Sequence, residues 1–104
     1  MKDEYTQQYI GKYVVVSTDE TKRGVFFGKL KEFNPEDLTI SLEESQMCVR
    51  WSEETRGFNG LAANGPMKGS RITEPVPEQY LVGVSCVMLA SDAAIKRWKK
   101  CPWE

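Results

Sequence analysis

The sequence predicts a β-dominated α+β fold: a small, partly open antiparallel β-barrel of the SH3-like type, with a short inserted helix and a C-terminal helix. Short runs of β-branched or alternating apolar residues recur along the chain, and glycine and proline turns separate them. Only two short segments have the apolar spacing of a helix. The chain has 104 residues, 40% hydrophobic and 28% charged, which is typical of one compact soluble domain with a single core.

The N-terminal strands are expected within residues 10–51, after a polar lead-in over residues 1–9. The run 12–18 (KYVVVST) contains three consecutive valines, as in a strand that is buried on both faces. A polar turn ending in glycine should return the chain as a hairpin strand over 25–31. Within that strand, Gly28 indicates a bulge or a close approach by another backbone.

Two alternating stretches follow this hairpin. Residues 38–43 alternate between apolar and polar side chains, which predicts a strand with one face in solvent. A second alternating stretch covers 46–51. It is either a further strand or the continuation of the same strand past a bulge around Glu44 and Ser45.

Helix signals are confined to two segments. Residues 52–64 begin with a serine followed by two glutamates and place Phe58, Leu61 and Ala62 on one face, which predicts a short inserted helix. Residues 91–100 begin with Ser-Asp and end in basic residues. This pattern predicts a C-terminal helix that docks its apolar side on the body.

A glycine-rich loop and further strands lie between the two helices. Loop residues 65–70 contain two glycines and a proline, and we interpret them as a candidate functional lid. Strands are expected over 71–90. Pro75 and Pro77 exclude a central position in the sheet for the first of these strands. The apolar run 81–90 predicts a central strand.

Composition excludes several classes of function. The chain has no histidine, and its 14 lysines and arginines nearly balance 15 acidic residues, for a net charge of -1. Without histidine there is no His-dependent proton shuttle, Ser/His or Cys/His nucleophile pair or Cys₂His₂ zinc site. The near-neutral charge gives no field to attract nucleic acid or an anionic membrane. We therefore expect a binding protein rather than an enzyme, with no catalytic residues, metal or cofactor.

The three cysteines predict a reducing compartment. Cys48, Cys86 and Cys101 lie far apart and form no CxxC pair, so we expect free thiols. The N-terminal residues contain no apolar signal segment, and the longest apolar runs are too short to span a bilayer. These features predict a cytoplasmic protein without membrane contact.

An ordered set of short motifs extends from about residue 10 to residue 98. It comprises Tyr13-Val-Val-Val-x-Thr18, Gly24-Val-x-x-Gly28-x-Leu30, Trp51, Leu61-Ala-x-x-Gly65, Ser70-Arg-Ile72, Val76 and Ser91-Asp-Ala-Ala94. In this order the motifs resemble a family of small, uncharacterised proteins encoded by tailed phages and prophages. Where relatives often carry an acidic residue followed by two arginines and an aromatic, this chain has Glu44-Ser-Gln-Met47. The resemblance implies a phage origin, a small accessory role in the host cytoplasm and no enzyme activity.

Basic and aromatic residues near the inserted helix and the glycine-rich loop form a candidate ligand site. Convergent arginines and the backbone N–H groups of a glycine-rich loop suit a phosphate, and an aromatic ring adds stacking for a base. The alternative is that the tryptophan belongs to the core and the charges are ordinary surface groups. The candidate residues are Arg50, Trp51, Arg56, Lys68, Ser70 and Arg71.

These observations lead to two hypotheses of function. The first is a phage counter-defence protein that sequesters a nucleotide-derived immune signal, a cyclic nucleotide or an ADP-ribose derivative. It would hold this ligand between the subunits of a homo-oligomer, because so small a body offers little concavity. The second is a phage inhibitor that binds a host or defence protein through a strand edge or the C-terminal helix, with Trp98, Lys99 and Trp103 as contacts. Alternatively, Trp98 only docks that helix on the core. Nucleic acid is not an expected partner.

Overall fold

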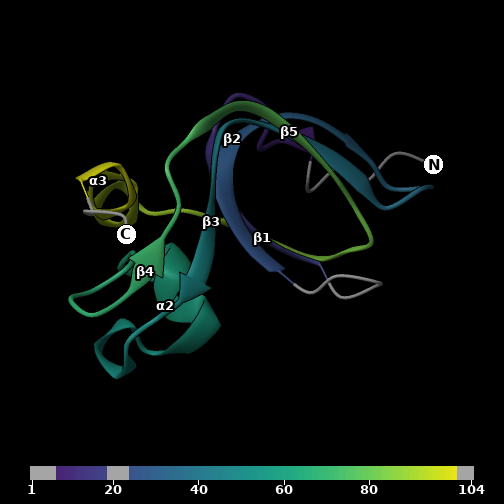
Figure 1. The fold of residues 1–104 in the computed structure, drawn as a ribbon. Coiled ribbons are helices and arrows are strands. Elements are labelled where there is room, and N and C mark those ends of the chain that lie inside the picture. Colours follow the sequence, from purple (N-terminus) through teal and green to yellow (C-terminus); the bar gives the residue numbers. More distant parts are fainter. Residues whose placement is uncertain (1–6, 19–23, 101–104) are drawn as a thin grey trace.

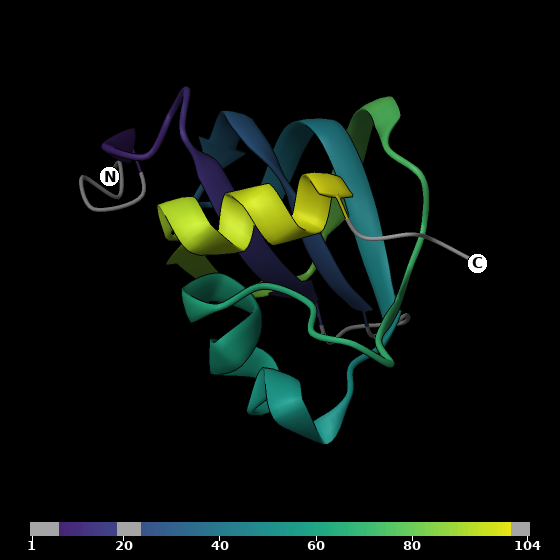
Figure 2. The same cartoon turned by 90° about the vertical axis from the view of Figure 1, so that its left-hand side faces the viewer.

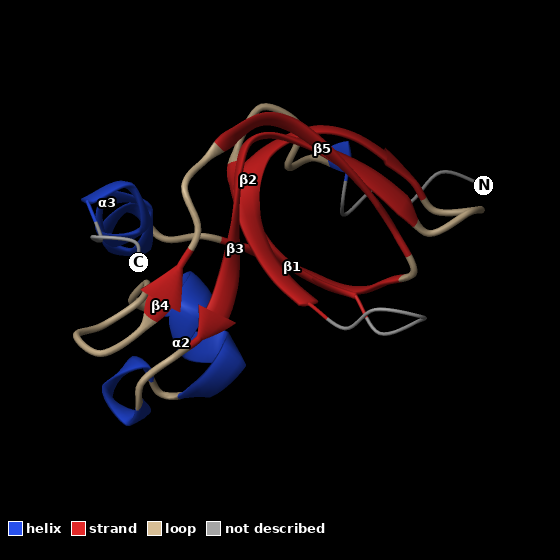
Figure 3. Ribbon diagram, viewed as in Figure 1, coloured by secondary structure: helices blue, strands red, loops and turns tan. Residues whose placement is uncertain are grey.

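The computed structural model of the chain describes residues 7–18 and 24–100. In this part, six strands form one antiparallel sheet, and the helices α2 and α3 pack against the outside of its curve (Figures 1 and 3). The strand order is β4, β3, β2, β1, β6, and β5 pairs with β3 as β4 does. The strands are β1 (Tyr13–Thr18), β2 (Gly24–Asn34), β3 (Thr39–Arg50), β4 (Arg71–Ile72), β5 (Val76–Val82) and β6 (Val84–Leu89).

β1 is a central strand, with β2 on one side and β6 on the other. Its side chains Val14, Val15 and Val16 are all 0% exposed. Val14 and Val16 belong to the apolar cluster inside the curved sheet, whereas Val15 belongs to the cluster beneath the helices. Both faces of this strand are therefore covered. The predicted buried strand and its hairpin with β2 are confirmed.

Gly28 lies at a bulge between β2 and β3. The register of the two strands shifts between Phe27 and Lys29, and a Cβ atom at Gly28 would stand 2.9 Å from the Cβ atom of Leu42. The close approach predicted at this glycine is confirmed. On β3, Glu44 has a φ of 52° and the strand continues past it without a break. Of the two alternatives for this region, continuation past a bulge is correct.

The expected solvent face of β3 is covered. Thr39 and Ser41 are only 9% and 7% exposed. β5 runs alongside, and its residues Val82 and Tyr80 stand opposite these two residues. Since cross-strand neighbours share a face of the sheet, the larger side chains of β5 shield the smaller ones of β3. The alternation thus predicted the strand correctly but its solvent face wrongly.

The apolar run 81–90 is not one central strand. Gly83 has a left-handed backbone conformation with a φ of 72°, and it divides the run between β5 and β6. These two strands go to opposite edges of the sheet. The sheet curls strongly, but its two edges do not pair with each other in the described residues (Figure 1). The predicted SH3-like barrel is therefore corrected to an open, β-dominated antiparallel α+β fold.

The segment expected to form one inserted helix is divided in two. A 3₁₀ turn covers Glu53–Thr55 and α2 covers Gly57–Ala63. Arg56 separates them because its φ of 70° is incompatible with a right-handed helix. Leu61 and Ala62 of α2 are buried against the sheet, which confirms the predicted apolar face.

The helix α3 (Asp92–Lys100) lies across the outside of the sheet, beside α2 (Figure 2). The Ala94 N–H donates to the Ser91 hydroxyl at 3.1 Å, so the predicted N-cap is confirmed. The same hydroxyl donates to the carbonyl oxygen of Ala63 at 2.6 Å and links the two helices. No helix in the described part is both long and apolar enough to cross a membrane.

Candidate functional site

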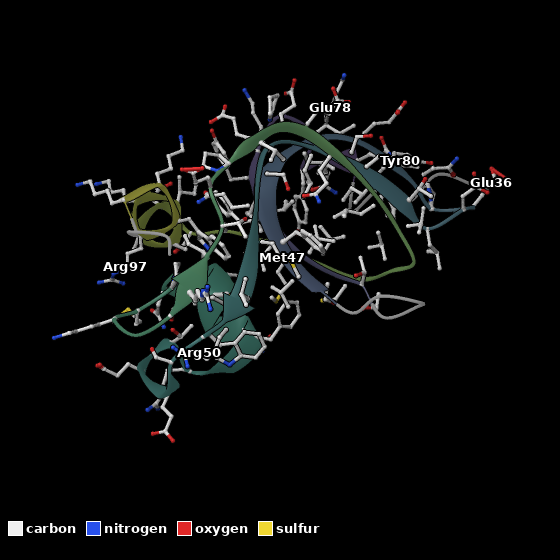
Figure 4. The ribbon with its side chains drawn as sticks, viewed as in Figure 1. Glu36, Met47, Arg50, Glu78, Tyr80 and Arg97 are labelled. Carbon is white, nitrogen blue, oxygen red and sulfur yellow. The ribbon has the colours of Figure 1, made fainter. Side chains whose placement is uncertain are left out.

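Two arginines lie opposite each other where the sheet ends. Arg50 is the last residue of β3, Arg71 is the first residue of β4, and the two form a cross-strand pair, here called the arginine pair. Both residues are exposed, and Figure 4 shows Arg50 at the end of β3 near α2. A guanidinium nitrogen of Arg50 donates to the carbonyl oxygen of Gly69 at 3.4 Å. Trp51 follows directly and is 38% exposed. The fold thus brings two arginines, an accessible indole and the glycine-rich loop together.

Ser70 holds this loop against the 3₁₀ turn. The Ser52 N–H donates to the Ser70 hydroxyl at 3.0 Å, and the same hydroxyl lies 3.1 Å from that of Thr55. Thr55 is fully buried and also accepts a hydrogen bond from the Met67 N–H at 3.0 Å. Internal hydrogen bonds therefore hold the loop 65–70 against the 3₁₀ turn, which argues against the lid role expected from its composition. Ser70 positions the loop through these internal bonds.

The tip of the loop provides backbone donors. The Ser70 N–H donates to the Met67 carbonyl at 3.0 Å, which closes a turn around Lys68 and Gly69. Gly69 has a φ of 95°, the conformation that a type II turn requires at its third position. Within the described residues, the N–H groups of Lys68 and Gly69 have no intramolecular acceptor. They can therefore donate to an anion bound beside the loop.

The other two basic candidates lie at the margin of this surface. Lys68 is exposed at the tip of the loop, and Arg56 is exposed after the 3₁₀ turn. Glu53 and Glu54 belong to the same turn as Arg56 and lower the positive potential around it. The positive character of the site is therefore concentrated at the arginine pair and Lys68.

Trp98 is unavailable as a surface contact. It is 0% exposed, its indole N–H donates to the Leu61 carbonyl at 3.0 Å, and its ring stacks on Phe27 with 4.8 Å between centroids. Phe27 in turn stacks on Tyr13 at 5.3 Å. This tryptophan fixes α3 to the sheet, so its assignment as a partner contact is wrong and the core interpretation is correct.

Lys99, the second proposed partner contact, is exposed and lies over the Tyr13 ring, 4.4 Å from its centroid. The interaction with the Tyr13 hydroxyl raises the pKa of Lys99 above its usual value, and the nearby carboxylate of Glu44 adds to the effect. Lys99 therefore remains a cation that stabilises the packing of α3. Trp103, the third contact, lies outside the described residues.

Within the part that the structure describes, no cysteine takes part in a disulfide and no cluster of metal ligands is found. Cys48 is buried and Cys86 is half-buried, and both are free thiols. Cys101 lies outside the described residues. No group of three or more cysteine, aspartate or glutamate side chains in this part is arranged to hold a metal ion.

Sequence reasoning missed a groove at the opposite end of β3. It has a volume of about 620 Å³ and is lined in part by Thr39, Ser41 and Tyr80. The sequence did contain a signal, since two hydroxyl residues alternate with apolar ones in this strand. The sequence alone did not show that β5 pairs with this strand and lies beside Thr39 and Ser41.

A protein-family model matches most of the chain. The family model described as a domain of unknown function, DUF6948, matches residues 11–98. The chain belongs to this family. Its matched range includes the arginine pair and every described strand, and it ends within α3. No curated protein matches the chain.

Among solved structures, this DUF6948 protein is similar to a heptameric archaeal Sm protein that was described for its implications for the eukaryotic snRNP core. The two chains share 15% sequence identity, with a TM-score of 0.55. The match covers 86% of this chain and 100% of the Sm chain. At this low identity the similarity concerns the fold, which is a small, curved, Sm-like antiparallel sheet.

Proposed function

We propose that this DUF6948 protein is a non-enzymatic binding protein that takes up a phosphate-bearing, nucleotide-type ligand at the arginine pair. The observation that carries the proposal is the cross-strand position of Arg50 and Arg71 beside the fixed loop. The two residues stand opposite each other at a shift of register between β3 and β4, so two cationic side chains leave the sheet from neighbouring backbone positions. A bound phosphate offsets their mutual repulsion and accepts charge-assisted hydrogen bonds from both.

Two neighbouring features support a nucleotide rather than a simple anion. The N–H groups of Lys68 and Gly69 add donors for phosphate oxygens next to Arg50. Trp51, the next residue in the chain, is 38% exposed, and a base can stack on an accessible indole. Groups for phosphate recognition and for stacking thus come from adjacent residues of the chain.

The resemblance of the motif pattern to small phage proteins supports one biological role for such binding. In that role the protein acts in the host cytoplasm and sequesters a nucleotide-derived signal of antiviral defence. A cyclic nucleotide and an ADP-ribose derivative both combine phosphates with a stackable base. Binding without turnover is sufficient for sequestration, so no catalytic group is needed.

Native mass spectrometry of the purified protein with cyclic oligonucleotides and ADP-ribose derivatives tests this function. We expect one intact ligand mass per site, and a loss of affinity of about tenfold or more in the double variant Arg50→Ala/Arg71→Ala. The variant Lys96→Ala/Lys100→Ala removes the same charge from exposed positions of α3 and should retain the ligand. Unchanged retention by the arginine variant, or release of a chemically altered ligand, contradicts the proposal.

Self-association through the sheet edges is the second part of the proposal. β5 pairs only with β3, and β6 pairs only with β1, within the described residues, so each strand has a free edge. The two strands have 7 and 6 residues, and exposed apolar side chains lie on both, namely Val82 and Leu89. Pairing of the β5 edge of one copy with the β6 edge of the next removes both free edges. The heptameric assembly of the similar Sm protein supports this arrangement.

Oligomer mass, measured by native mass spectrometry and light scattering, tests the assembly separately from ligand binding. We expect a defined oligomer that dissociates in the variants Val82→Lys and Leu89→Lys, because a buried lysine opposes edge pairing. Val49→Lys is the control, since Val49 is 53% exposed and Val82 is 55% exposed. A monomeric wild-type protein at micromolar concentration contradicts the assembly without affecting the test of the arginine pair.

A further inference from the structure

The groove of about 620 Å³ lies at the end of β3 away from the arginine pair. It is formed by the end of β2, the turn to β3, the start of β3 and Tyr80 of β5, with Gln7 and Ile10 at its border. Figure 4 shows Tyr80 and Glu36 at the opposite end of the molecule from Arg50. The groove is therefore separate from the proposed nucleotide site, and its volume is typical of a small-molecule site.

Two buried hydroxyl residues that line this groove have no hydrogen-bond partner among the residues that the structure describes. Thr39 and Ser41 are 9% and 7% exposed, and neither side chain makes a hydrogen bond within the described part of the chain. Every fully buried side-chain oxygen in that part does have a partner. The two hydroxyl oxygens must therefore be open to the groove. Being two residues apart on a strand, they point to the same side, each able to accept and to donate a hydrogen bond.

The charged side chains give the groove an excess of negative charge. Glu32 and Glu36 both line it, and neither forms an ion pair among the described residues. The one cation in the lining, Lys31, is already paired with Glu78 at 3.2 Å. The backbone of Glu36 is fixed by a hydrogen bond in which its N–H donates to the side-chain oxygen of Asn34 at 3.0 Å. An anionic ligand is therefore disfavoured here.

Tyr80 contributes an aromatic face to the same groove. Its side chain is 64% exposed although it stands in the middle of a strand, directly opposite Ser41. An exposed aromatic ring beside uncompensated carboxylates is an environment that binds ammonium and guanidinium groups, through the ring and through charge-assisted hydrogen bonds.

We propose that this groove binds a small organic cation, an amine or a guanidine. Its cationic group lies over Tyr80 and is neutralised by Glu32 and Glu36, and its N–H groups donate to the hydroxyls of Thr39 and Ser41. This satisfies the two hydroxyls, which have no hydrogen-bond partner among the described residues. The site does not depend on the proposed nucleotide function.

Titration of the ¹⁵N-labelled protein with agmatine, followed by NMR, tests the proposal. Agmatine carries a guanidinium at one end and an ammonium at the other. We expect its addition to shift the amide signals of Thr39, Ser41 and Tyr80, whereas neutral 1,4-butanediol and anionic glutarate leave them unchanged. Such a response locates the cation in the groove.

Matched variants then test the residues. Glu32→Gln/Glu36→Gln should weaken agmatine binding about tenfold or more, and Thr39→Val/Ser41→Ala severalfold. Glu53→Gln/Glu54→Gln removes the same charge outside the groove and should bind as the wild type does. The spectrum of each variant also reports whether it is folded. Absence of shifts at millimolar agmatine, equal weakening in the control, or binding of glutarate overturns the proposal.

Discussion

The side-chain amide of Gln46 donates a hydrogen bond to the backbone carbonyl of Trp98, 3.3 Å away and separated by 52 residues in the chain. The same amide nitrogen donates to the carbonyl of Thr73 at 3.1 Å. Gln46 is only 3% exposed, so one buried amide connects β3 to the segment after β4 and to the end of α3. These bonds fix the C-terminal helix at the end where its carbonyls have no partners within the helix.

Replacement of this amide should destabilise the protein. Gln46→Ala leaves two carbonyl oxygens without their donor in a buried place, which we expect to lower the free energy of unfolding by about 1–3 kcal/mol. Urea denaturation followed by circular dichroism measures the change. Gln8 is exposed, and Gln8→Ala should stay within about 0.5 kcal/mol of the wild type. Equal stability of the two variants would show that the Gln46 bonds contribute nothing.

Two glycines with similar backbone conformation should respond differently to alanine. Gly57 and Gly65 have φ values of 78° and 84°. A Cβ atom on Gly57 would meet nothing within 4 Å, whereas on Gly65 it would lie 2.9 Å from the Ala94 carbonyl oxygen and 2.8 Å from the Cβ atom of Arg97. We expect Gly57→Ala to cost about 1–2 kcal/mol in thermal denaturation. Gly65→Ala should cost about 3 kcal/mol or more, because displacement of α3 is added to the backbone strain.

Loss of the Ser70 hydroxyl should release the glycine-rich loop. In Ser70→Ala the Ser52 N–H loses its acceptor, which costs about 1–3 kcal/mol. Amide hydrogen exchange should become faster over residues 64–70 while the central strand β1 stays protected. Ser85→Ala is the control because that hydroxyl is exposed. Unchanged exchange in the loop would contradict the positioning role of Ser70.

The Lys99 contact predicts a loss of stability at high pH. Interaction with the Tyr13 hydroxyl raises the pKa of Lys99 in the folded protein above its usual 10.5. The stabilisation by the charged Lys99 contact is therefore complete below pH 10.5. It disappears as the pH rises through the higher pKa that Lys99 has in the folded state. We expect the difference in unfolding free energy between the wild type and Lys99→Met to be largest near neutral pH and to shrink as the pH rises above 10.5. A difference that is independent of pH would contradict this role of the charge.

Local patterns predicted several elements correctly because the residues that cause them are neighbours in the chain. Three consecutive valines indicated the buried strand β1, and the serine before Asp92 indicated the cap of α3. Gly28 indicated a close backbone approach before its neighbour Leu42 was known. The candidate residues Arg50 and Arg71 were chosen for their type, and the fold places them opposite each other.

The failed predictions concern which strands lie side by side. The run 81–90 is apolar enough for a central strand, but the left-handed conformation of Gly83 sends its halves to opposite edges of the sheet. Arg56 likewise divides a segment whose apolar spacing is helical, since its positive φ is not encoded by side-chain periodicity. Trp98 stands between basic residues in the sequence, yet it lies in the core because α3 turns that face to the sheet.

The sequence alone determined the β-rich class, most strand positions and the two helical segments, because hydrophobic periodicity, turn residues and caps act over a few neighbouring residues. Tertiary structure alone decided that the sheet stays open, that β5 covers Thr39 and Ser41, and that these hydroxyls meet Glu32, Glu36 and Tyr80 in one groove. Strand pairing joins residues about 40 positions apart, as between Ser41 and Tyr80. Such pairing depends on the curvature and packing of the whole sheet, which no local pattern encodes.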